Sequence, residues 1–207
     1  MIPTLPNLYR FATSELSQDA ILAYILAWAD CAHADSTDHL PSHHLGDRLL
    51  RRLVREAAEA QGLPDPLDRR ANLVVEVQPQ VDHVDILVSI DDDILLVIED
   101  KTGTKEHGSQ IVVYVDDLKA KYPSKMVLAA FIKTRPESLA SLEELSFSCC
   151  KMLRANLLEE LNRDRPTGNN IIDEFRGFLQ QGENRCEKFR SEPVARWSGD
   201  AIEGFYQ

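Results

Sequence analysis

Apolar residues recur at helical spacing in two long segments of the N-terminal third. In residues 13–30 they form one broad stripe, which predicts a mostly buried helix. Residues 43–60 place leucines on one side and arginines on the other, as amphipathic helices do. A glycine and two prolines in residues 61–68 then interrupt the pattern. Two helices followed by a turn are therefore expected before any strand.

Three apolar segments follow in quick succession, at residues 72–78, 84–90 and 94–101. They are short, rich in valine and isoleucine and bounded by turn residues, which is typical of strands. A Pro-Gln pair precedes the second segment and three consecutive aspartates precede the third, so an antiparallel meander is predicted. The second and third segments are too apolar to be half exposed. They are expected in the middle of a sheet that is covered on both faces.

The rest of the chain predicts mainly helices. A helix at residues 108–121 precedes a fourth strand at 126–132, and a short strand is expected near Phe147. Helices follow at 152–163 and 169–181. The sequence therefore predicts an α/β fold in which helices flank a central mixed sheet, built from the three-strand meander plus a fourth strand.

Length and composition fit one globular domain of 207 residues, 43% of them hydrophobic and 28% charged. Residues 1–150 are expected to form the core with its N-terminal helices, and residues 151–207 a helical extension packed on the same domain. The chain shows no signal-peptide pattern and no run of about 20 apolar residues, so a cytoplasmic protein outside the membrane is expected. The four cysteines form no C-x-x-C pair, which favours reduced thiols.

Charged residues interrupt two of the apolar strands. Asp85 lies in the second strand, and Glu99 and Lys101 end the third. Residues two apart on a strand point to the same face. If the two strands pair about a turn centred near Asp92, Asp85 lies roughly opposite Glu99 to Lys101. Two carboxylates and a lysine are therefore expected to converge.

Such a cluster needs a compensating partner, because isolated buried charges are costly. A salt bridge between Lys101 and one of the carboxylates would suffice and would catalyse nothing. A divalent cation would also suffice, since Mg²⁺ prefers a few carboxylates and keeps several waters. Lys101 would then lie beside a phosphate oxygen and orient or activate the attacking water.

This pattern resembles the PD-(D/E)XK phosphodiesterase superfamily, which includes restriction endonuclease-like and RecB-like nucleases. The core of that superfamily, a helix, a three-strand meander, a helix and a fourth strand, is similar to the order of elements predicted here. Val84-Asp85 resembles the PD element, with valine in place of the proline. Glu99-Asp100-Lys101 resembles the (D/E)XK element.

Further residues support the same resemblance. Gln110 and Tyr114 resemble the Q-x-x-x-Y motif of the RecB-like branch, and residues four apart on a helix face the same way. Glu15 resembles the acidic residue that the first helix contributes to the site in many members. Leu45-Gly46, in the second predicted helix, is similar to a bacterial branch of uncharacterised PD-(D/E)XK proteins.

The resemblance implies a nuclease that uses Mg²⁺ or Mn²⁺ to hydrolyse phosphodiester bonds, with DNA as the expected substrate. It implies Asp85 and Glu99 as metal ligands, the backbone carbonyl of Asp100 as a further ligand, and Lys101 as the catalytic lysine. Alternation along the strand would point the Asp100 side chain away from Glu99 and Lys101. Asp82 is a fallback for Asp85, although it precedes the apolar strand and fits a turn better.

Nucleic acid would have to be met by a local basic patch, because the net charge of −11 gives no basic footprint overall. Four arginines recur on one side of the second predicted helix, where a solvated face is the simpler interpretation and phosphate contact the alternative. They are Arg48, Arg51, Arg52 and Arg55. Lys105 and His107, in the loop after the third strand, are second candidates.

Other interpretations stay open. The chain could be a non-catalytic nucleic-acid- or partner-binding protein on the same fold, or an acidic inhibitor of a basic partner. A homodimer or a complex with a partner subunit is compatible with either. Glu76 could point into the site but is expected to be solvated. The four histidines between residues 33 and 44 match no zinc motif and are expected at the surface or in loops.

Overall fold

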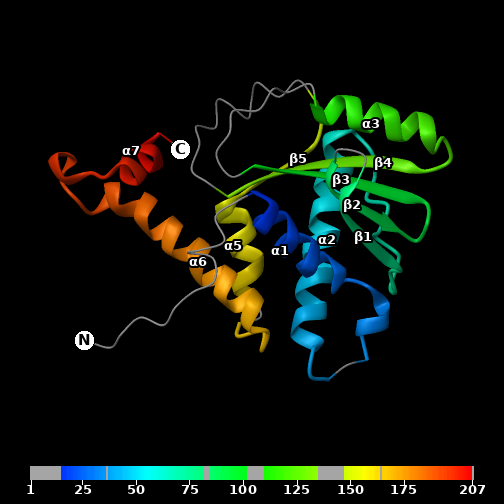
Figure 1. Ribbon diagram of the computed structural model, residues 1–207, viewed down its shortest axis with the longest axis horizontal. Helices are drawn as coiled ribbons and strands as arrows, with labels where there is room; N and C mark the ends of the chain where they lie inside the picture. The colour runs from blue at the N-terminus through cyan, green and yellow to red at the C-terminus, as the bar shows by residue number, and fades with distance from the viewer. Residues whose placement is uncertain are drawn as a thin grey trace.

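A five-stranded sheet lies at the centre of the structure, and helices cover both of its faces (Figure 1). This computed structural model describes residues 15–35, 37–81, 84–101, 110–134, 147–163 and 165–206, with the backbone alone for Glu15, Leu16, Lys101, Gln110 and Glu203. The strands are β1 (Val75–Val81), β2 (Val84–Ile90), β3 (Ile94–Lys101), β4 (Met126–Lys133) and β5 (Cys150–Leu153). The α-helices are α1 (Glu15–Ala27), α2 (Leu40–Ala60), α3 (Gln110–Lys121), α5 (Arg154–Arg163), α6 (Asn170–Cys186) and α7 (Gly199–Phe205). Short 3-10 helices are η2 (Cys31–His33), η3 (Glu187–Arg190) and η4 (Val194–Arg196).

The strands lie in the order β1-β2-β3-β4-β5. β1, β2 and β3 pair antiparallel, so the predicted meander is confirmed. β4 is parallel to β3, and β5 is parallel to β4. α3 lies in the crossover from β3 to β4, as parallel neighbours require. The predicted α/β fold is therefore confirmed, and the expected short strand lies at Cys150–Leu153 rather than at Phe147.

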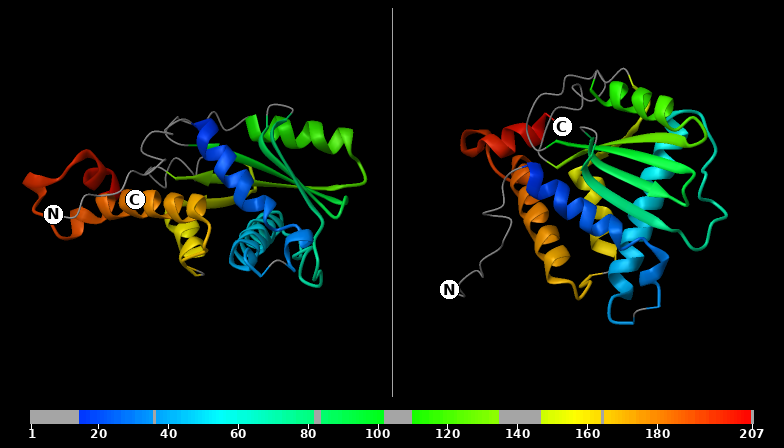
Figure 2. Two further views of the ribbon diagram at one scale, coloured as in Figure 1. Left: turned by 60° about the horizontal axis from the view of Figure 1, so that its bottom comes forward. Right: turned by 45° about the vertical axis from the view of Figure 1, so that its right-hand side comes forward.

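Two apolar clusters fill the space between the sheet and its helices. On one face, Ile86 and Ile98 pack with residues of α1, α2, α5 and α6. On the other face, Leu87 and Val97 pack with residues of α3 (Figure 2). β2 and β3 are thus covered on both faces, as their unbroken apolar sequences predict.

β1 is shifted relative to its prediction. It begins at Val75 rather than at residue 72, because Val74 bonds to the turn between β2 and β3: its N–H donates to the Asp91 carboxylate at 2.9 Å, and its carbonyl accepts from the Asp91 N–H at 2.9 Å. The strand then continues through Pro79, which the sequence suggested as part of a link. β1 is an edge strand, and an edge tolerates a residue that cannot donate to a second neighbour.

α2 begins at Leu40 rather than at residue 43, and Pro41 fits the first turn because the missing N–H has no helical partner there. Further along, α2 approaches α1 closely at Gly46. A Cβ at this position would lie 2.6 Å from the Ile25 carbonyl oxygen and 2.8 Å from the Ala29 nitrogen. The crossing of these two helices therefore requires glycine.

α6 contributes to the main core through Ile172, Phe175 and Leu179, which are all buried. Its apolar stripe lies against the same cluster as α1 and α2. α6 is therefore part of the apolar cluster that buries one face of the sheet.

Arg154 joins the C-terminal helices to the sheet. Its buried guanidinium donates to the Thr134 carbonyl at 3.1 Å, to the Glu183 carboxylate at 2.7 Å and to the Cys186 sulfur at 3.1 Å. Thr134 directly follows β4, so the end of α6 is held where β3 and β4 end. α7 packs on the same end of α6, since a Cβ at Gly204 would lie 2.3 Å from the Cys186 carbonyl oxygen.

The four cysteines are free, and all except Cys31 are buried, in agreement with the prediction of reduced thiols. Burial, reinforced by the nearby Glu56 carboxylate, raises the pKa of the Cys150 thiol. None of the described helices is long and apolar enough to cross a membrane.

Candidate functional site

The start of β2 and the end of β3 bring Asp85 and Glu99 together. The β2–β3 register pairs Ile90 with Ile94 and Ile86 with Ile98, so the next position along places Asp85 across from Glu99. The register predicted from the aspartate turn is thereby confirmed. An Asp100 N–H donates to the Asp85 carboxylate at 3.0 Å, which fixes that carboxylate against the end of β3.

Alternation along the strands assigns both carboxylates to the face of the sheet that α3 covers, and Val84, at the start of β2, also packs in the α3-side cluster. Leu87 and Val97, each two residues away along its strand, pack in the α3-side cluster, and side chains two apart on a strand share a face. Glu99 is only 3% exposed, whereas Asp85 is half-buried. Two negative charges at facing strand positions are stabilised by positive charge placed beside them.

Asp100 points to the opposite face, as alternation along the strand predicts. Its carboxyl accepts a hydrogen bond from the Gln18 amide at 2.5 Å, and Gln18 in turn accepts from the Thr134 hydroxyl at 2.6 Å. Burial, and then the charge of Asp19, raise the pKa of Asp100 well above the ordinary aspartate value. The Asp100 carboxyl is therefore enclosed between α1 and the sheet, on the face opposite Asp85 and Glu99.

Three polar residues of this region were not among the predicted site residues. Gln18 and Asp19, both buried on α1, reach the ends of the strands, where the Asp19 carboxylate accepts from the Gln80 amide at 2.9 Å. Lys133 ends β4 and lies beside Lys101 in the parallel register. It is 2% exposed and follows Phe131 by two residues, which places it on the α3-side face. The available signal was a lysine closing an apolar strand, as Lys101 does.

α3 brings the predicted Q-x-x-x-Y motif to the same face of the sheet. Gln110 is the first residue of α3, and Tyr114 lies one turn later, partly buried against the α3-side cluster. The side chains of Gln110, Lys101 and Glu15 lie outside the described part of the structure. Their backbone positions are the start of α3, the end of β3 and the start of α1.

The remaining candidates fall into two groups. Asp82, Lys105 and His107 lie outside the described residues. Glu76 is exposed on the edge strand, as expected, and accepts a hydrogen bond from the Gln78 amide.

Three of the four histidines between residues 33 and 44 gather around Trp28, and the exposed His44 lies beside His43. The rings of His33 and His39 lie 4.9 and 5.1 Å from the Trp28 ring, and His43 shares a hydrogen bond with the Trp28 carbonyl. Packing around an indole accounts for these residues without a metal. Across the whole described part of the chain, no three His, Cys, Asp or Glu side chains gather into a metal-binding group.

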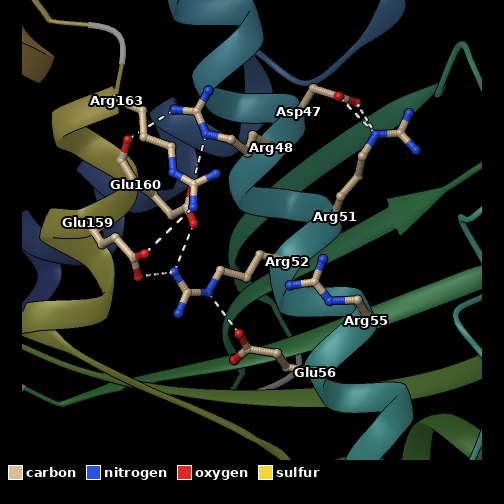
Figure 3. Close-up of a pocket in the computed structure, with 9 residues that line it drawn as sticks. All are labelled: Asp47, Arg48, Arg51, Arg52, Arg55, Glu56, Glu159, Glu160 and Arg163. Atoms are coloured by element: carbon tan, nitrogen blue, oxygen red, sulfur yellow. Dashed lines mark hydrogen bonds and ion pairs between the residues drawn. The ribbon is translucent and has the colours of Figure 1, made fainter.

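The four predicted arginines lie on α2 beside a polar hollow of about 490 Å³ that α5 also lines (Figure 3). Arg48 pairs with Glu160 at 2.8 Å, and Arg52 pairs with both Glu160 and Glu159. The stripe is therefore not simply solvated, because two glutamates of α5 neutralise part of it.

Arg51 and Arg55 differ from the other two arginines. Arg51 pairs with Asp47 of its own helix at 2.8 Å, and Arg55 reaches Glu59 only at 3.9 Å and is 48% exposed. Contact of any of these arginines with phosphate stays a prediction.

Comparison with known proteins matches residues 6–174 to the model of one family, the PD-(D/E)XK nuclease superfamily. No curated protein and no solved structure matches the chain significantly. The matched segment contains the paired carboxylates of β2 and β3, the glutamine and tyrosine of α3, and the whole sheet. Because this match covers most of the 207 residues, the chain belongs to the PD-(D/E)XK nuclease superfamily.

Proposed function

We propose that this protein is a Mg²⁺- or Mn²⁺-dependent nuclease that hydrolyses phosphodiester bonds in DNA, with its active site where β2 begins and β3 ends. Membership of the superfamily supports a nuclease-type function in general. The specific proposal rests on the placement of Asp85 and Glu99. They occupy facing register positions of two mostly apolar strands.

The donor set of the proposed site fits a hard divalent cation. Asp85 and Glu99 would hold it through carboxylate oxygens, and the backbone carbonyl of Asp100 would add a further oxygen. Two carboxylates and one carbonyl leave room for the waters that Mg²⁺ retains. When bound, the cation supplies positive charge that stabilises the charge developing on the phosphate.

The chain's own residues orient the reacting groups. The hydrogen bond from the Asp100 N–H holds the Asp85 carboxylate in one orientation. In the proposal, Lys101 presents its ammonium to a phosphate oxygen and to the attacking water, so that it orients the water and stabilises the negative charge that develops on the phosphate. Glu15, from α1, helps to orient the water.

The other proposed residues position the nucleic acid. Gln110 and Tyr114 lie at i and i+4 on α3, and they are proposed to contact the scissile phosphate. Backbone phosphates are assigned to the α2 arginines and Lys105. Among them Arg55 is the most available, because its ion pair with Glu59 is long and it is half exposed. Arg48 and Arg52 would first have to leave Glu160.

Cleavage assays test this proposal. The purified protein is incubated with linear, circular and single-stranded DNA and with RNA, each with Mg²⁺, Mn²⁺ or a chelator. Asp85→Asn, Glu99→Gln and Lys101→Ala should each abolish metal-dependent cleavage while circular dichroism shows an unchanged fold. Asp116→Asn is the matched control, because it neutralises an exposed carboxylate on α3 and should leave cleavage intact.

Calorimetry with Mg²⁺ and Mn²⁺ adds a readout that does not depend on turnover. Binding of the metal should be weakened by Asp85→Asn and by Glu99→Gln. Undiminished cleavage by both Asp85→Asn and Lys101→Ala would refute the assignment. Metal-independent binding of nucleic acid, with no cleavage of any substrate, would favour the non-catalytic alternative.

A further inference from the structure

Four aromatic rings cluster at the C-terminal end of the chain. Phe189, Trp197, Phe205 and Tyr206 contact one another with ring centroids 5.1–6.1 Å apart. Phe205 is 53% exposed and Tyr206 is 71% exposed. This C-terminal aromatic cluster follows residue 174, where the family match ends, so the superfamily does not account for it.

The cluster lies at the end of the sheet where the proposed active site is found. Arg154 ties the end of α6 to Thr134, directly after β4, and α7 packs on that end of α6. Figure 1 and the right-hand view of Figure 2 both show α7 on the side where β3 and β4 end. Aromatic rings and paired carboxylates are thus held on one side of the molecule.

Exposed cations accompany the rings. Residues 185–206 contain four basic and four acidic residues, in a chain whose net charge is −11. Arg185 and Lys188 pair with Asp200 and Glu192, which leaves Arg190 and Arg196 as the exposed cations beside the rings. The Arg190 guanidinium lies 5.3 Å from the centre of the Phe189 ring. Neither Arg190 nor Arg196 forms an ion pair with a residue that the structure describes, in contrast to Arg48 and Arg52.

We propose that the C-terminal aromatic cluster binds the unpaired bases of a single-stranded nucleic acid that leads to the active site. This inference rests on the proposed nuclease function and specifies its substrate as a strand with unpaired bases. Exposed rings stack on bases of any sequence, and neighbouring arginines hold the phosphates. Paired bases present no free face, so duplex DNA would gain little from the rings.

A second copy of the chain is the main competing occupant of this patch. A two-fold interface would place this patch of one copy against the same patch of the other, which brings Arg190 and Arg196 of both copies into one interface. Like charges opposed across an interface are unfavourable. The basic residues therefore favour a polyanion over a second copy.

Anisotropy titrations of the full chain in chelator measure binding without cleavage. The probes are short fluorescent oligothymidylate, oligouridylate and a duplex of matched length. Phe205→Ser/Tyr206→Ser should weaken binding of the single strands by about tenfold or more and change duplex binding little. Phe205→Tyr/Tyr206→Phe keeps both rings and should retain the affinity. Comparison of the two single strands shows whether DNA or RNA is preferred.

A salt series tests the cations separately. Arg190→Ala/Arg196→Ala should reduce the slope of log affinity against log salt by about 1.4 for single strands, because each phosphate contact contributes about 0.7. Arg69→Ala is the control, since it removes an exposed arginine from the loop after α2 and should change neither slope nor affinity.

The outcomes separate this inference from the proposed function. If the wild type cleaves nucleic acid but the serine double variant binds single strands as tightly as wild type, the inference is wrong and the nuclease assignment stands. If the double variant instead turns a dimer into a monomer in sedimentation, with unchanged strand affinity, the cluster is an interface between copies. If the wild type neither binds nor cleaves any substrate, the proposed function itself fails.

Discussion

Replacing Arg154 with methionine should destabilise the protein by about 3 kcal/mol. A hydrogen bond to a charged partner contributes about 1.5–3 kcal/mol and one to a neutral carbonyl about 1 kcal/mol, and the guanidinium makes both, to Glu183 and to Thr134. Only 8% of the Arg154 side chain is exposed, but 21% of the Glu183 side chain is. Water therefore screens the carboxylate left behind, and the loss should stay below the roughly 5 kcal/mol of a fully buried broken pair.

Urea unfolding followed by circular dichroism measures this loss. Arg163→Met is the control, because Arg163 is 52% exposed and its ion pairs are long, at 3.6 and 3.7 Å, so about 1 kcal/mol or less is expected. Arg154→Met/Glu183→Leu should recover at least half of the loss, since no unpaired charge remains in the double variant. Arg154 does not tie α6 to the sheet if Arg154→Met costs no more than the control, or if the double variant is no more stable than Arg154→Met.

Three further predictions follow from packing and protonation. Because the pKa of Asp100 is raised, the folded state binds the Asp100 proton more tightly than the unfolded chain does. The stabilisation that this proton contributes is fully present below the pKa of the unfolded chain and is lost as pH rises through the folded pKa. In chelator, Asp100→Asn should flatten that fall in the free energy of unfolding above about pH 4, and an unchanged pH profile would contradict this. Gly46→Ala should lower the free energy of unfolding by about 1–3 kcal/mol, because the new Cβ meets the α1 backbone. Gly177→Ala has open space and should be neutral or stabilising by up to about 1 kcal/mol; equal effects of the two would argue against the close crossing. The raised pKa of Cys150 predicts very slow alkylation by iodoacetamide at pH 8 until the protein is unfolded, which mass spectrometry can check; rapid labelling of the native thiol would show that Cys150 is not enclosed.

The central strands and their register were predictable because they are determined by residues that lie close together in the sequence. β2 and β3 are joined by three aspartates, of which Asp91 and Asp92 adopt positive φ angles of 48° and 62°. A tight turn fixes which residues face each other, so Asp85 and Glu99 could be paired from the sequence. The opposite orientation of the Asp100 side chain followed from alternation alone.

Other features depend on partners far away in the sequence. Arg48 and Arg52 contact Glu160, which lies more than a hundred residues away in the sequence. The spacing of the arginines on α2 therefore could not predict that a glutamate of α5 neutralises two of them. The hydrogen bond between Gln18 and Asp100 likewise joins distant segments. The start of β1 depends on the bonds of Val74 to the neighbouring turn, which apolar patterning does not encode.

The burial of α6 has a consequence for where the chain can be shortened. The family match stops at residue 174, in the first turns of α6, yet Phe175 and Leu179 lie beyond that point in the main core. A protein truncated at the family boundary would expose the apolar surface of α1 and α5 that these residues cover. Such a truncation should aggregate or fail to fold, so loss of activity in it would say nothing about catalysis. The smallest unit that folds is thus longer than the segment that the superfamily shares.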